Sequence, residues 1–320
     1  MLSSIKQQWH SITETAPSGP AASRPVAQPL PAAEVVDSRA QKLLVAGWEL
    51  EGVSIAGQET CIIVPRAKVA FDIGRCPQRA VFQQTVLISH GHLDHIGGCP
   101  FHVASRSMQA LPPSKLVVPP AYVETLKSYL DLSQQLQGSP PGVEYEVLPL
   151  QTGEELSLPS GFLCRPFPTT HTIASQGYLI YSLRKKLRSD LQGRSQEDIR
   201  SLRLAGEEVQ ETHQVPEIAF TGDTTSAFLD QAGIEDVLHA RLLIMEMSFL
   251  DDAVSVEEAK EKGHMHIADF IAHAHRFQNE AILLIHFSAR YKRSHILSAL
   301  NILPPNLRSR CVPLLNGYAD

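Results

Sequence analysis

The stretch "TVLISHGHLDHIGG", Thr85 to Gly98, decides the fold of this chain. It opens with a short apolar run rich in β-branched residues, which is typical of a buried strand. Four side chains that commonly bind metals follow within six residues: His90, His92, Asp94 and His95. Their spacing lines neither one face of a helix nor one face of a strand, so we expect a loop. Gly97 and Gly98 would permit tight backbone turns after that loop.

Three further segments end in a histidine or an aspartate, two of them directly after an apolar strand-like run. "EIAFTGD" ends in Asp223, "AILLIH" ends in His286, and "RPFPTTH" ends in His171. Each of these alone is ordinary, and local hydrogen bonding is the competing interpretation. Because open α/β sheets place their sites at the carboxyl ends of strands, we expect these three residues to converge on the histidine cluster.

The converging set would contain five imidazoles and two carboxylates. Such nitrogen and oxygen donors suit zinc; they are too many for one tetrahedral ion and the right number for two ions that share a carboxylate. Two divalent ions about 3.5 to 4 Å apart activate water near neutral pH and neutralise charge on a phosphoryl group during in-line attack. The sequence therefore predicts a two-metal site suited to phosphodiester hydrolysis.

The composition limits the class of protein. With 320 residues, 43% of them hydrophobic, the chain can bury the core of one large domain or two modest ones. Its apolar runs stay far below the ~20 residues of a membrane-spanning helix, so we expect no membrane segment. A net charge of −6 argues against a globally basic nucleic-acid binder but leaves room for a local basic patch. Five dispersed cysteines without a CxxC pair predict neither disulfides nor a thiolate zinc site, and favour a reducing compartment.

The chain divides into a leader and a folded domain. Residues 1–42 are rich in Pro, Ala and Ser without hydrophobic periodicity, which predicts a disordered leader. A transit peptide is the alternative, weakened by few arginines and by Glu14 and Glu34. From Leu43 to the end, at 43–320, short β-like runs come first and strands alternating with helical patterns follow. This order predicts an α/β fold in which helices cover the sheets in layers.

A charged interval, Arg184 to Arg203, interrupts the strands "GYLIYSL" and "EIAFTGD". It holds seven basic residues against three acidic ones, a local net charge of +4. Charge alone favours a solvated surface helix. The position of the interval between two strands instead indicates a protruding basic arm, which we place at about 184–214, with Arg184, Lys185 and Lys186 as candidate contacts to a phosphate backbone.

"SHGHLDHIGG" is similar to the HxHxDH signature of the metallo-β-lactamase superfamily, which implies a four-layer αβ/βα sandwich. Four further stretches, "FDIGRCPQRA", "SQGYLIYSL", "FTGDTTS" and "LLIHFSARY", resemble the short, plant-type form of ribonuclease Z (tRNase Z). The resemblance extends over nearly all of Leu50 to Leu314. It implies a zinc-dependent endoribonuclease that removes the 3′ trailer from precursor tRNA and leaves a 3′-hydroxyl. It also implies two Zn²⁺ per chain, with Mn²⁺ as a substitute, and a homodimer.

The resemblance further implies a role for each site residue. His90, His92 and His171 would hold one zinc. Asp94, His95 and His286 would hold the other, and Asp223 would bridge the two. Asp94 would also orient and deprotonate the attacking water.

Glu246 and His264 match the family's pair that protonates the leaving 3′ oxygen, a sensible acid because the carboxylate aligns the imidazole. The alternative for His264 is a surface histidine in a histidine-rich helix start. Ser288, Arg290 and Tyr291 would contact phosphate, with ordinary surface polarity at a strand end as the alternative.

Two segments depart from the family pattern. Arg75, Cys76 and Pro77 stand where many relatives have Glu-Gly-Thr, so substrate or trailer preference can differ. The arm corresponds in position to the family's tRNA-binding arm, but it is short and lacks the Gly-Pro motif at its tip. The resemblance therefore does not extend to binding of the tRNA elbow by this arm.

Two other functions remain open on the sequence alone. One is a small-molecule phosphodiesterase or sulfatase of the same fold, and the other is a non-catalytic RNA- or protein-binding member. For the compartment we favour the cytoplasm or nucleus; a chloroplast location would require the leader to be a transit peptide.

Overall fold

The computed structural model describes residues 41–138 and 143–320, so nearly all of the expected leader lies outside the described residues. Strand β1 begins at Gln41, two residues inside the segment assigned to that leader. Among the described residues, no helix is long and apolar enough to cross a membrane. All five cysteines are free thiols, as expected from their dispersed positions in the sequence.

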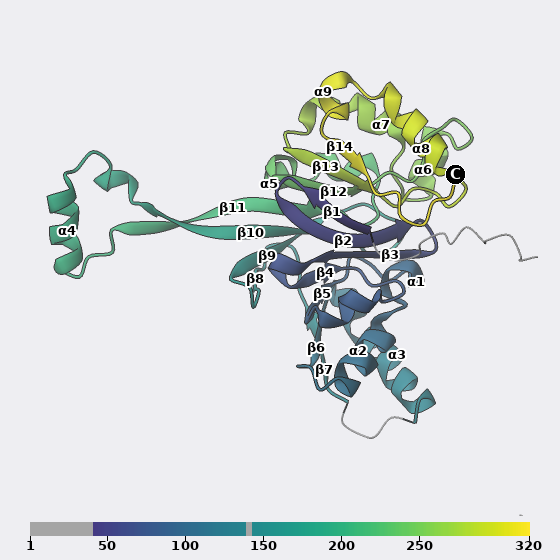
Figure 1. Ribbon diagram of the computed structural model, residues 1–320, viewed down its shortest axis with the longest axis horizontal. Helices are drawn as coiled ribbons and strands as arrows, with labels where there is room; N and C mark the ends of the chain where they lie inside the picture. The colour runs from purple at the N-terminus through teal and green to yellow at the C-terminus, as the bar shows by residue number, and fades with distance from the viewer. Residues whose placement is uncertain (1–40, 139–142) are drawn as a thin grey trace, which may run out of the picture. The chain divides into compact units, whose positions relative to one another are not determined.

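Two seven-stranded sheets form the centre of the fold (Figure 1). The first follows chain order and comprises β1 (Gln41–Val45), β2 (Trp48–Ile55), β3 (Glu59–Val64), β4 (Val69–Phe71), β5 (Thr85–Leu87), β6 (Ser114–Val118) and β7 (Tyr145–Pro149). The second comprises β8 (Leu156–Ser157), β9 (Phe162–Pro168), β10 (Gln176–Leu187), β11 (Gln210–Phe220), β12 (Leu242–Glu246), β13 (Ala281–Ile285) and β14 (Cys311–Pro313). Each sheet begins with antiparallel pairs and ends with parallel ones, β4 to β7 and β11 to β14.

The sheets face each other across a shared apolar core. Side chains of both sheets meet there, and the rings of Phe71 and Phe220 stack with centroids 4.7 Å apart. Helices cover the two outer faces, so the layers run helix, sheet, sheet, helix (Figure 1). The expected four-layer sandwich is confirmed. In such sandwiches the burial of both sheet faces supplies most of the favourable free energy of folding.

Helices on the first sheet's side are α1 (Leu93–Ile96), α2 (Cys99–Met108) and α3 (Val123–Leu136). Helix α3 follows the proline stop predicted after its strand and buries Leu126 and Leu130 against the sheet. On the side of the second sheet lie α5 (Glu235–His239), α6 (Val256–Glu261), α7 (Ile267–Ala272), α8 (Arg293–Ala299) and α9 (Pro305–Arg308). Ser255 caps α6 by accepting a hydrogen bond from the backbone N–H of Glu258, which is why that helix begins there.

The charged interval forms a strand before it forms a helix. β10 continues to Leu187 and pairs with β11 as far as Gln210, and the two strands lead to α4 (Gln196–Leu204) (Figure 1). The structure thus forms the arm that the position of the interval indicated, and the surface helix that charge alone favours is limited to Gln196–Leu204. The physical reason is the pairing partner: the polar residues from Gln210 onward extend the ladder beyond the apolar part of both strands.

Candidate metal centre

The signature segment is loop in its first half and helix in its second. His90 and His92 follow β5 in a loop, whereas Asp94 and His95 lie in the one-turn helix α1. The backbone N–H groups of His95 and Ile96 both donate to the His92 carbonyl, at 2.9 and 3.0 Å. The expectation of a loop is wrong for Asp94 and His95 because His92, in extended conformation, lets the next residues close a helical turn.

The two glycines after the signature form the turn between α1 and α2 and pack closely against neighbouring backbone. Both have right-handed helical φ and ψ, with φ −56° at Gly97 and −82° at Gly98. A Cβ at Gly98 would lie 2.6 Å from the carbonyl oxygen of Ile73 and 2.6 Å from the backbone nitrogen of Cys76. The expected turn at these residues is confirmed, and glycine is also required there because the backbone after β4 passes too near for any side chain.

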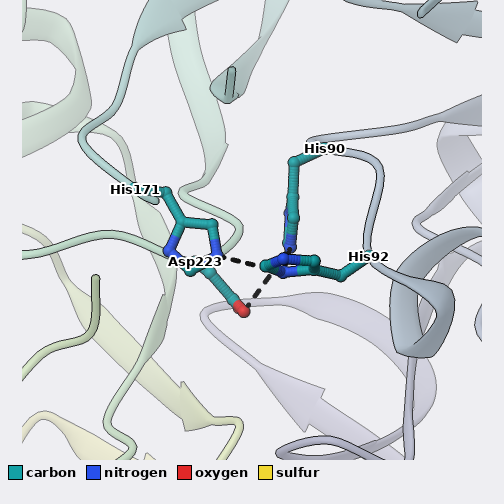
Figure 2. Close-up of side chains that lie close together, drawn as sticks. All are labelled: His90, His92, His171 and Asp223. Atoms are coloured by element: carbon teal, nitrogen blue, oxygen red, sulfur yellow. Dashed lines mark hydrogen bonds and ion pairs between the residues drawn. The ribbon is translucent and has the colours of Figure 1, made fainter. Parts of the chain in front are cut away.

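Four ligand-type side chains converge at the first half of the site (Figure 2). They are His90, His92, His171 and Asp223, and one ligand atom from each lies within 4.8 Å of the others. His92 Nδ1 lies 3.1 Å from His90 Nε2 and 3.2 Å from His171 Nε2. Asp223 Oδ2 lies 3.7 Å from His90 Nε2.

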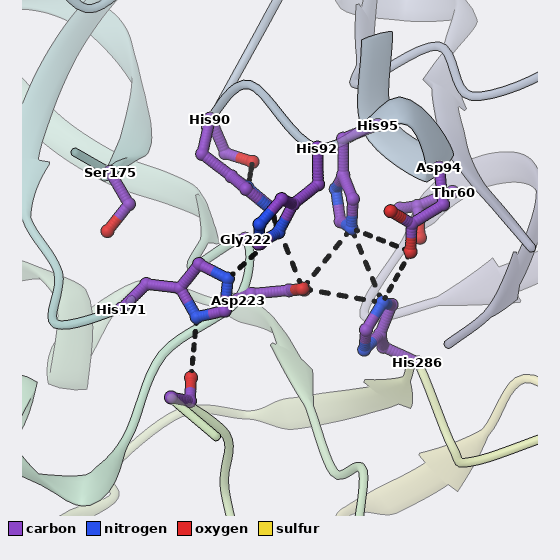
Figure 3. Close-up of polar contacts among 12 residues, drawn as sticks. Thr60, His90, His92, Asp94, His95, His171, Ser175, Gly222, Asp223 and His286 are labelled. Atoms are coloured by element: carbon purple, nitrogen blue, oxygen red, sulfur yellow. Dashed lines mark hydrogen bonds and ion pairs between the residues drawn. The ribbon is translucent and has the colours of Figure 1, made fainter. Parts of the chain in front are cut away.

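The second half of the site adjoins the first through Asp223 (Figure 3). Asp94, His95 and His286 form a group of the same tightness. Asp223 Oδ2 lies 3.3 Å from His95 Nε2 and 3.5 Å from His286 Nε2, while remaining in reach of His90. The structure thus brings together all seven residues that the sequence placed at the site.

The outer ring nitrogens show that these imidazoles are aimed inward. His171 Nδ1 donates to the Gly263 carbonyl at 2.7 Å, and His95 Nδ1 donates to the Asp72 carboxylate at 2.7 Å. His286 Nδ1 lies 3.0 Å from the Ser248 hydroxyl. A hydrogen bond that fixes one ring nitrogen turns the opposite nitrogen toward the centre, which is the arrangement of metal-ligating histidines.

Burial gives the first group the protonation state that a cation requires. Loss of water contact lowers the pKa of His90, His92 and His171 below the ordinary value, which keeps these imidazoles neutral. Burial by itself would raise the pKa of Asp223, but the neighbouring His286 and His95 outweigh it and hold the pKa well below the usual range. Neutral imidazoles around an ionised carboxylate fit a divalent cation.

Asp72 is a site residue that the sequence reasoning did not single out. It is fully buried with a left-handed φ of 54°, and it accepts from the backbone N–H of Ser89 at 2.7 Å and from the Ser89 hydroxyl at 2.8 Å, in addition to His95. It therefore orients His95 and the start of the histidine loop. The signal was present: Asp72 follows strand β4 as Asp223 follows β11.

Asp94 is held by backbone from the β2–β3 turn. The Gly57 N–H donates to Asp94 Oδ2 at 2.8 Å, and the same oxygen lies 3.4 Å from His286 Nε2. Burial raises the pKa of Asp94, but its hydrogen bond with His286 and the nearby charge of His95 outweigh this effect, so the pKa lies below its ordinary value. The carboxylate is therefore ionised and directed into the site.

Glu246 and His264 form a hydrogen-bonded pair beside the seven residues. Glu246 ends β12 fully buried, and its Oε1 lies 3.0 Å from His264 Nδ1. The Thr224 N–H and the Ser248 hydroxyl also donate to this carboxylate, at 2.6 and 2.5 Å. Burial lowers the pKa of His264, but Glu246 more than compensates and raises it to about 9.

His264 is thus protonated where His90, His92 and His171 are neutral. Its Nδ1 also lies 3.9 Å from Asp223, and the geometry alone would allow His264, Asp223 and His286 to share a cation. The proton-donor role agrees better with the structure, because the nitrogen nearest Asp223 already carries the hydrogen bond to Glu246.

Two of the three predicted phosphate contacts, Arg290 and Tyr291, already have side-chain partners within the protein. Arg290 donates to Asp251 at 3.0 Å and to the Tyr291 hydroxyl at 2.7 Å, and its guanidinium lies over the rings of Phe249 and Tyr291. Ser288 pairs by its backbone N–H with the Ser248 carbonyl at 3.0 Å. Contact of either residue with a substrate stays a prediction.

The three basic residues of the arm differ in their surroundings. Arg184 donates to the buried carboxylate of Glu217 at 2.8 Å. Lys185 and Lys186 are exposed on β10 beyond that pair. The two lysines are therefore the freer of the three for a phosphate backbone.

The fold and the site define a class of protein. The family model described as "Beta-lactamase superfamily domain" matches residues 75–287, which places the chain in that superfamily. The chain is 44% identical to tRNase Z TRZ1 of Arabidopsis thaliana over 274 residues, covering 86% of this chain and 97% of that protein. It is 41% identical to the chloroplastic tRNase Z TRZ2 of the same plant, covering 85% of this chain and 76% of the relative. The chain belongs to the tRNase Z family.

Solved structures agree with the fold. Human tRNase Z, short form, superposes with a TM-score of 0.53 at 18% identity, covering 75% of this chain and 92% of that one. A diphosphatase of the PhnP family superposes with a TM-score of 0.52 at 12% identity, covering 81% and 83%. These likenesses support the fold alone. The resemblance to ribonuclease Z found in the sequence is confirmed by the relatives of higher identity.

Proposed function

We propose that this chain is an endoribonuclease that removes the 3′ trailer from precursor tRNA and leaves a 3′-hydroxyl. The observation that carries the proposal is the convergence of seven ligand-type side chains beside a protonated histidine, in a chain that spans 97% of a tRNase Z. Relatives that cover most of this chain are named tRNase Z, and we extend their activity to it. We therefore favour it over a small-molecule phosphodiesterase or sulfatase and over a non-catalytic binding protein.

Two cations share the site in this proposal. His90, His92 and His171 hold one, Asp94, His95 and His286 hold the other, and Asp223 reaches both. The nitrogen-rich donor set suits zinc, with manganese as a substitute in activity. When bound, such a pair lowers the pKa of a water molecule and neutralises charge on the scissile phosphate.

Two groups of the protein move the protons. Asp94, held ionised and aimed by Gly57, orients the attacking water and accepts its proton. His264, held protonated by Glu246, donates a proton to the leaving 3′ oxygen. Separate groups for the base and the acid are needed because the reaction takes up one proton while it releases another.

The exposed lysines of the arm provide the contact with RNA. Lys185 and Lys186 lie on β10 beyond the end of its pairing with β9, where they can meet a phosphate backbone. The homodimer and the compartment stay predictions. Among the relatives, one is named chloroplastic and one, from Triticum aestivum, is named nuclear.

Cleavage of a 3′-extended precursor tRNA with mapping of both new ends tests the function. We expect a cut just after the discriminator base and a 3′-hydroxyl on the tRNA, with zinc or manganese supplied. Asp94→Ala should abolish cutting while the fold persists, and Asp252→Ala, which changes an exposed aspartate, should cut normally. Hydrolysis of bis(p-nitrophenyl) phosphate without cutting of the precursor would favour the small-molecule alternative, and the absence of both activities would favour the non-catalytic one.

A further inference from the structure

The arm, residues 184–214, leaves the second sheet at a β-bulge. The register between β10 and β11 shifts between Ile180 and Tyr181, which leaves Glu217 without a partner on β10. This is also where the hairpin loses its neighbours, since β9 pairs with β10 as far as Ser182 and β12 pairs with β11 only from Ile218 onward. Bulges bend a strand and increase its twist. The direction of the arm is thus set at the bulge.

The side chain of Glu217 fixes this bulge from inside. Glu217 is only 4% exposed, although it is charged and lies at the base of a protruding hairpin. Its Oε1 accepts from the Ser182 hydroxyl at 2.6 Å and from Arg184 at 2.8 Å, both on β10. Its Oε2 accepts from Arg241 at 3.4 Å. One carboxylate therefore joins the bulge, the first residue of the arm and the body of the domain.

Arg241 is itself anchored to the body. It lies directly before β12 and makes two further hydrogen bonds to Glu280, at 3.0 and 3.2 Å. Burial raises the pKa of Glu217, but donation from Ser182 and Arg184 outweighs it, so the carboxyl is ionised near neutral pH. A buried charge with three donors holds its partners much more firmly than an exposed pair does.

The opposite strand of the arm has a second, more exposed contact. Arg165 of β9 donates to the Gln214 side chain at 2.6 Å and to the Tyr181 hydroxyl at 3.1 Å, and it stacks on the Tyr181 ring. This contact supports the arm from the side of β9. Two further hydrogen bonds join the bulge to the body: the Arg241 N–H donates to the Pro216 carbonyl at 3.3 Å, and the Tyr181 hydroxyl donates to Asp236 at 2.8 Å. Glu217 adds the ionic contact that connects Arg184 of the arm with Arg241.

We propose that Glu217 fixes the direction in which the arm leaves the sheet and is thereby a positioning residue for the RNA that the arm contacts. The second half of this proposal rests on the proposed function, and the first half does not. Glu217→Gln keeps the size of the side chain but removes the charge that Arg184 and Arg241 share. The bulge then loses its ionic link to Arg241 and keeps only the hydrogen bonds of Pro216 and Tyr181, and the arm samples a wider range of directions.

Distance measurement between spin labels tests the mechanical half. Labels at Gln192→Cys on the arm and Glu49→Cys on β2, both exposed positions, are placed in a Cys311→Ser background because the other four cysteines are buried. We expect Glu217→Gln to broaden or shift the distance distribution. Arg241→Gln, which breaks the same contact from the body side, should do the same. Glu146→Gln, which removes another glutamate paired on a strand, should not. An unchanged distribution in Glu217→Gln would overturn the proposal.

Kinetics test the positioning half. We expect Glu217→Gln to raise KM for precursor tRNA about fivefold with kcat unchanged, and to leave bis(p-nitrophenyl) phosphate hydrolysis unchanged. If Glu217 acts through the arm, its effect should disappear in a Lys185→Ala/Lys186→Ala background. Equal loss of both activities would indicate misfolding of the site and overturn the positioning role.

The outcomes separate this proposal from the proposed function. A broadened distance with an unchanged KM for the precursor would refute positioning while it retains the mechanical role. Failure of the wild-type protein to cut any precursor would refute the proposed function, and the spin-label distances would still decide whether Glu217 holds the arm.

Discussion

Histidines at this site differ in charge because their neighbours differ, although all are buried or half-buried. Burial lowers the pKa of His90, His92 and His171, so these rings stay neutral and present lone pairs. His264 is half-buried as well, yet Glu246 raises its pKa to about 9. The Glu246 carboxylate, 3.0 Å from His264 Nδ1, therefore favours the protonated form that a proton donor requires.

Replacing Glu246 tests this division of roles. Glu246→Gln should retain the packing at the end of β12 but no longer favour the protonated form of His264. We expect kcat for precursor cleavage to fall about 100-fold or more, because the leaving oxygen loses its proton donor. Bound metal, measured by elemental analysis, should be unchanged. Loss of metal together with activity would instead make Glu246 part of the metal centre and contradict the acid role.

His102 is a buried histidine whose hydrogen-bond partners lie outside the site, and it makes the stability of the fold depend on pH. His102 donates from Nε2 to the carbonyls of Ala80 and Gln83, at 3.1 and 3.0 Å, and its Nδ1 lies 2.7 Å from the Ser114 hydroxyl. Burial, and then the charge of Arg106, lower its pKa to about 4. The folded state thus keeps His102 neutral where the unfolded chain takes up a proton.

This difference fixes the sign of the effect. The unfolded state binds more protons between about pH 6.5 and pH 4, so stability falls as the pH falls through this range and the full loss is about 3 kcal/mol. We expect urea unfolding of the wild-type protein to lose about 2 kcal/mol more than that of His102→Gln between pH 7 and pH 5. Parallel pH profiles of the two proteins would show that His102 is not the titrating group.

The sequence predicted most ligand residues well because they follow apolar strands at their carboxyl ends. Asp223 and His286 were recognised in this way, 133 and 196 residues after His90. Asp72 was missed although it also follows a strand, because its partners Ser89 and His95 become neighbours only when β4 pairs with β5. Hydrogen bonding behind a ligand depends on pairing that no local pattern contains.

At the scale of elements, prediction failed where polar residues form regular structure. For the interval from Arg184 to Arg203, charge alone favoured one surface helix and the position between two strands indicated an arm. The polar ends of β10 and β11 carry no apolar alternation that would have predicted them as strands. A signal for the true helix start was present: Ser195 accepts a hydrogen bond from the Asp198 N–H, a cap that the sequence "SQED" carries. The helix begins at that cap and not at Arg184.

The arm as an element predicts a salt dependence. Lys185→Ala/Lys186→Ala should weaken precursor binding at low salt and make the logarithm of affinity depend less steeply on salt, by about one unit of slope for each lysine that contacts a phosphate. Binding is measured with the inactive Asp94→Ala protein between low and physiological salt. Lys127→Ala, which changes an exposed lysine on α3, is the matched control and should leave the slope unchanged. An unaltered slope in the double variant would contradict RNA contact by these lysines.

At the scale of the whole domain, the candidate metal centre joins the two sheets. His90, His92, Asp94 and His95 follow β5 of the first sheet. The other three ligands belong to the second sheet: His171 follows β9, Asp223 follows β11 and His286 follows β13. Each proposed cation takes ligands from both sheets (Figures 2 and 3). Occupation of the site should therefore stabilise the packing of one sheet against the other.

Removal of metal should lower the stability of the folded domain. A ligand that binds only the folded state stabilises it by about 3 kcal/mol at a hundredfold excess over its Kd. We expect the thermal unfolding midpoint to fall after chelation and to recover when zinc is added back. Asp223→Ala, which removes the one carboxylate that reaches both halves, should respond much less to either treatment. Because the ligands of each half come from different sheets, a midpoint that is the same with and without metal would mean that no cation connects them, and the two-cation site would have to be abandoned.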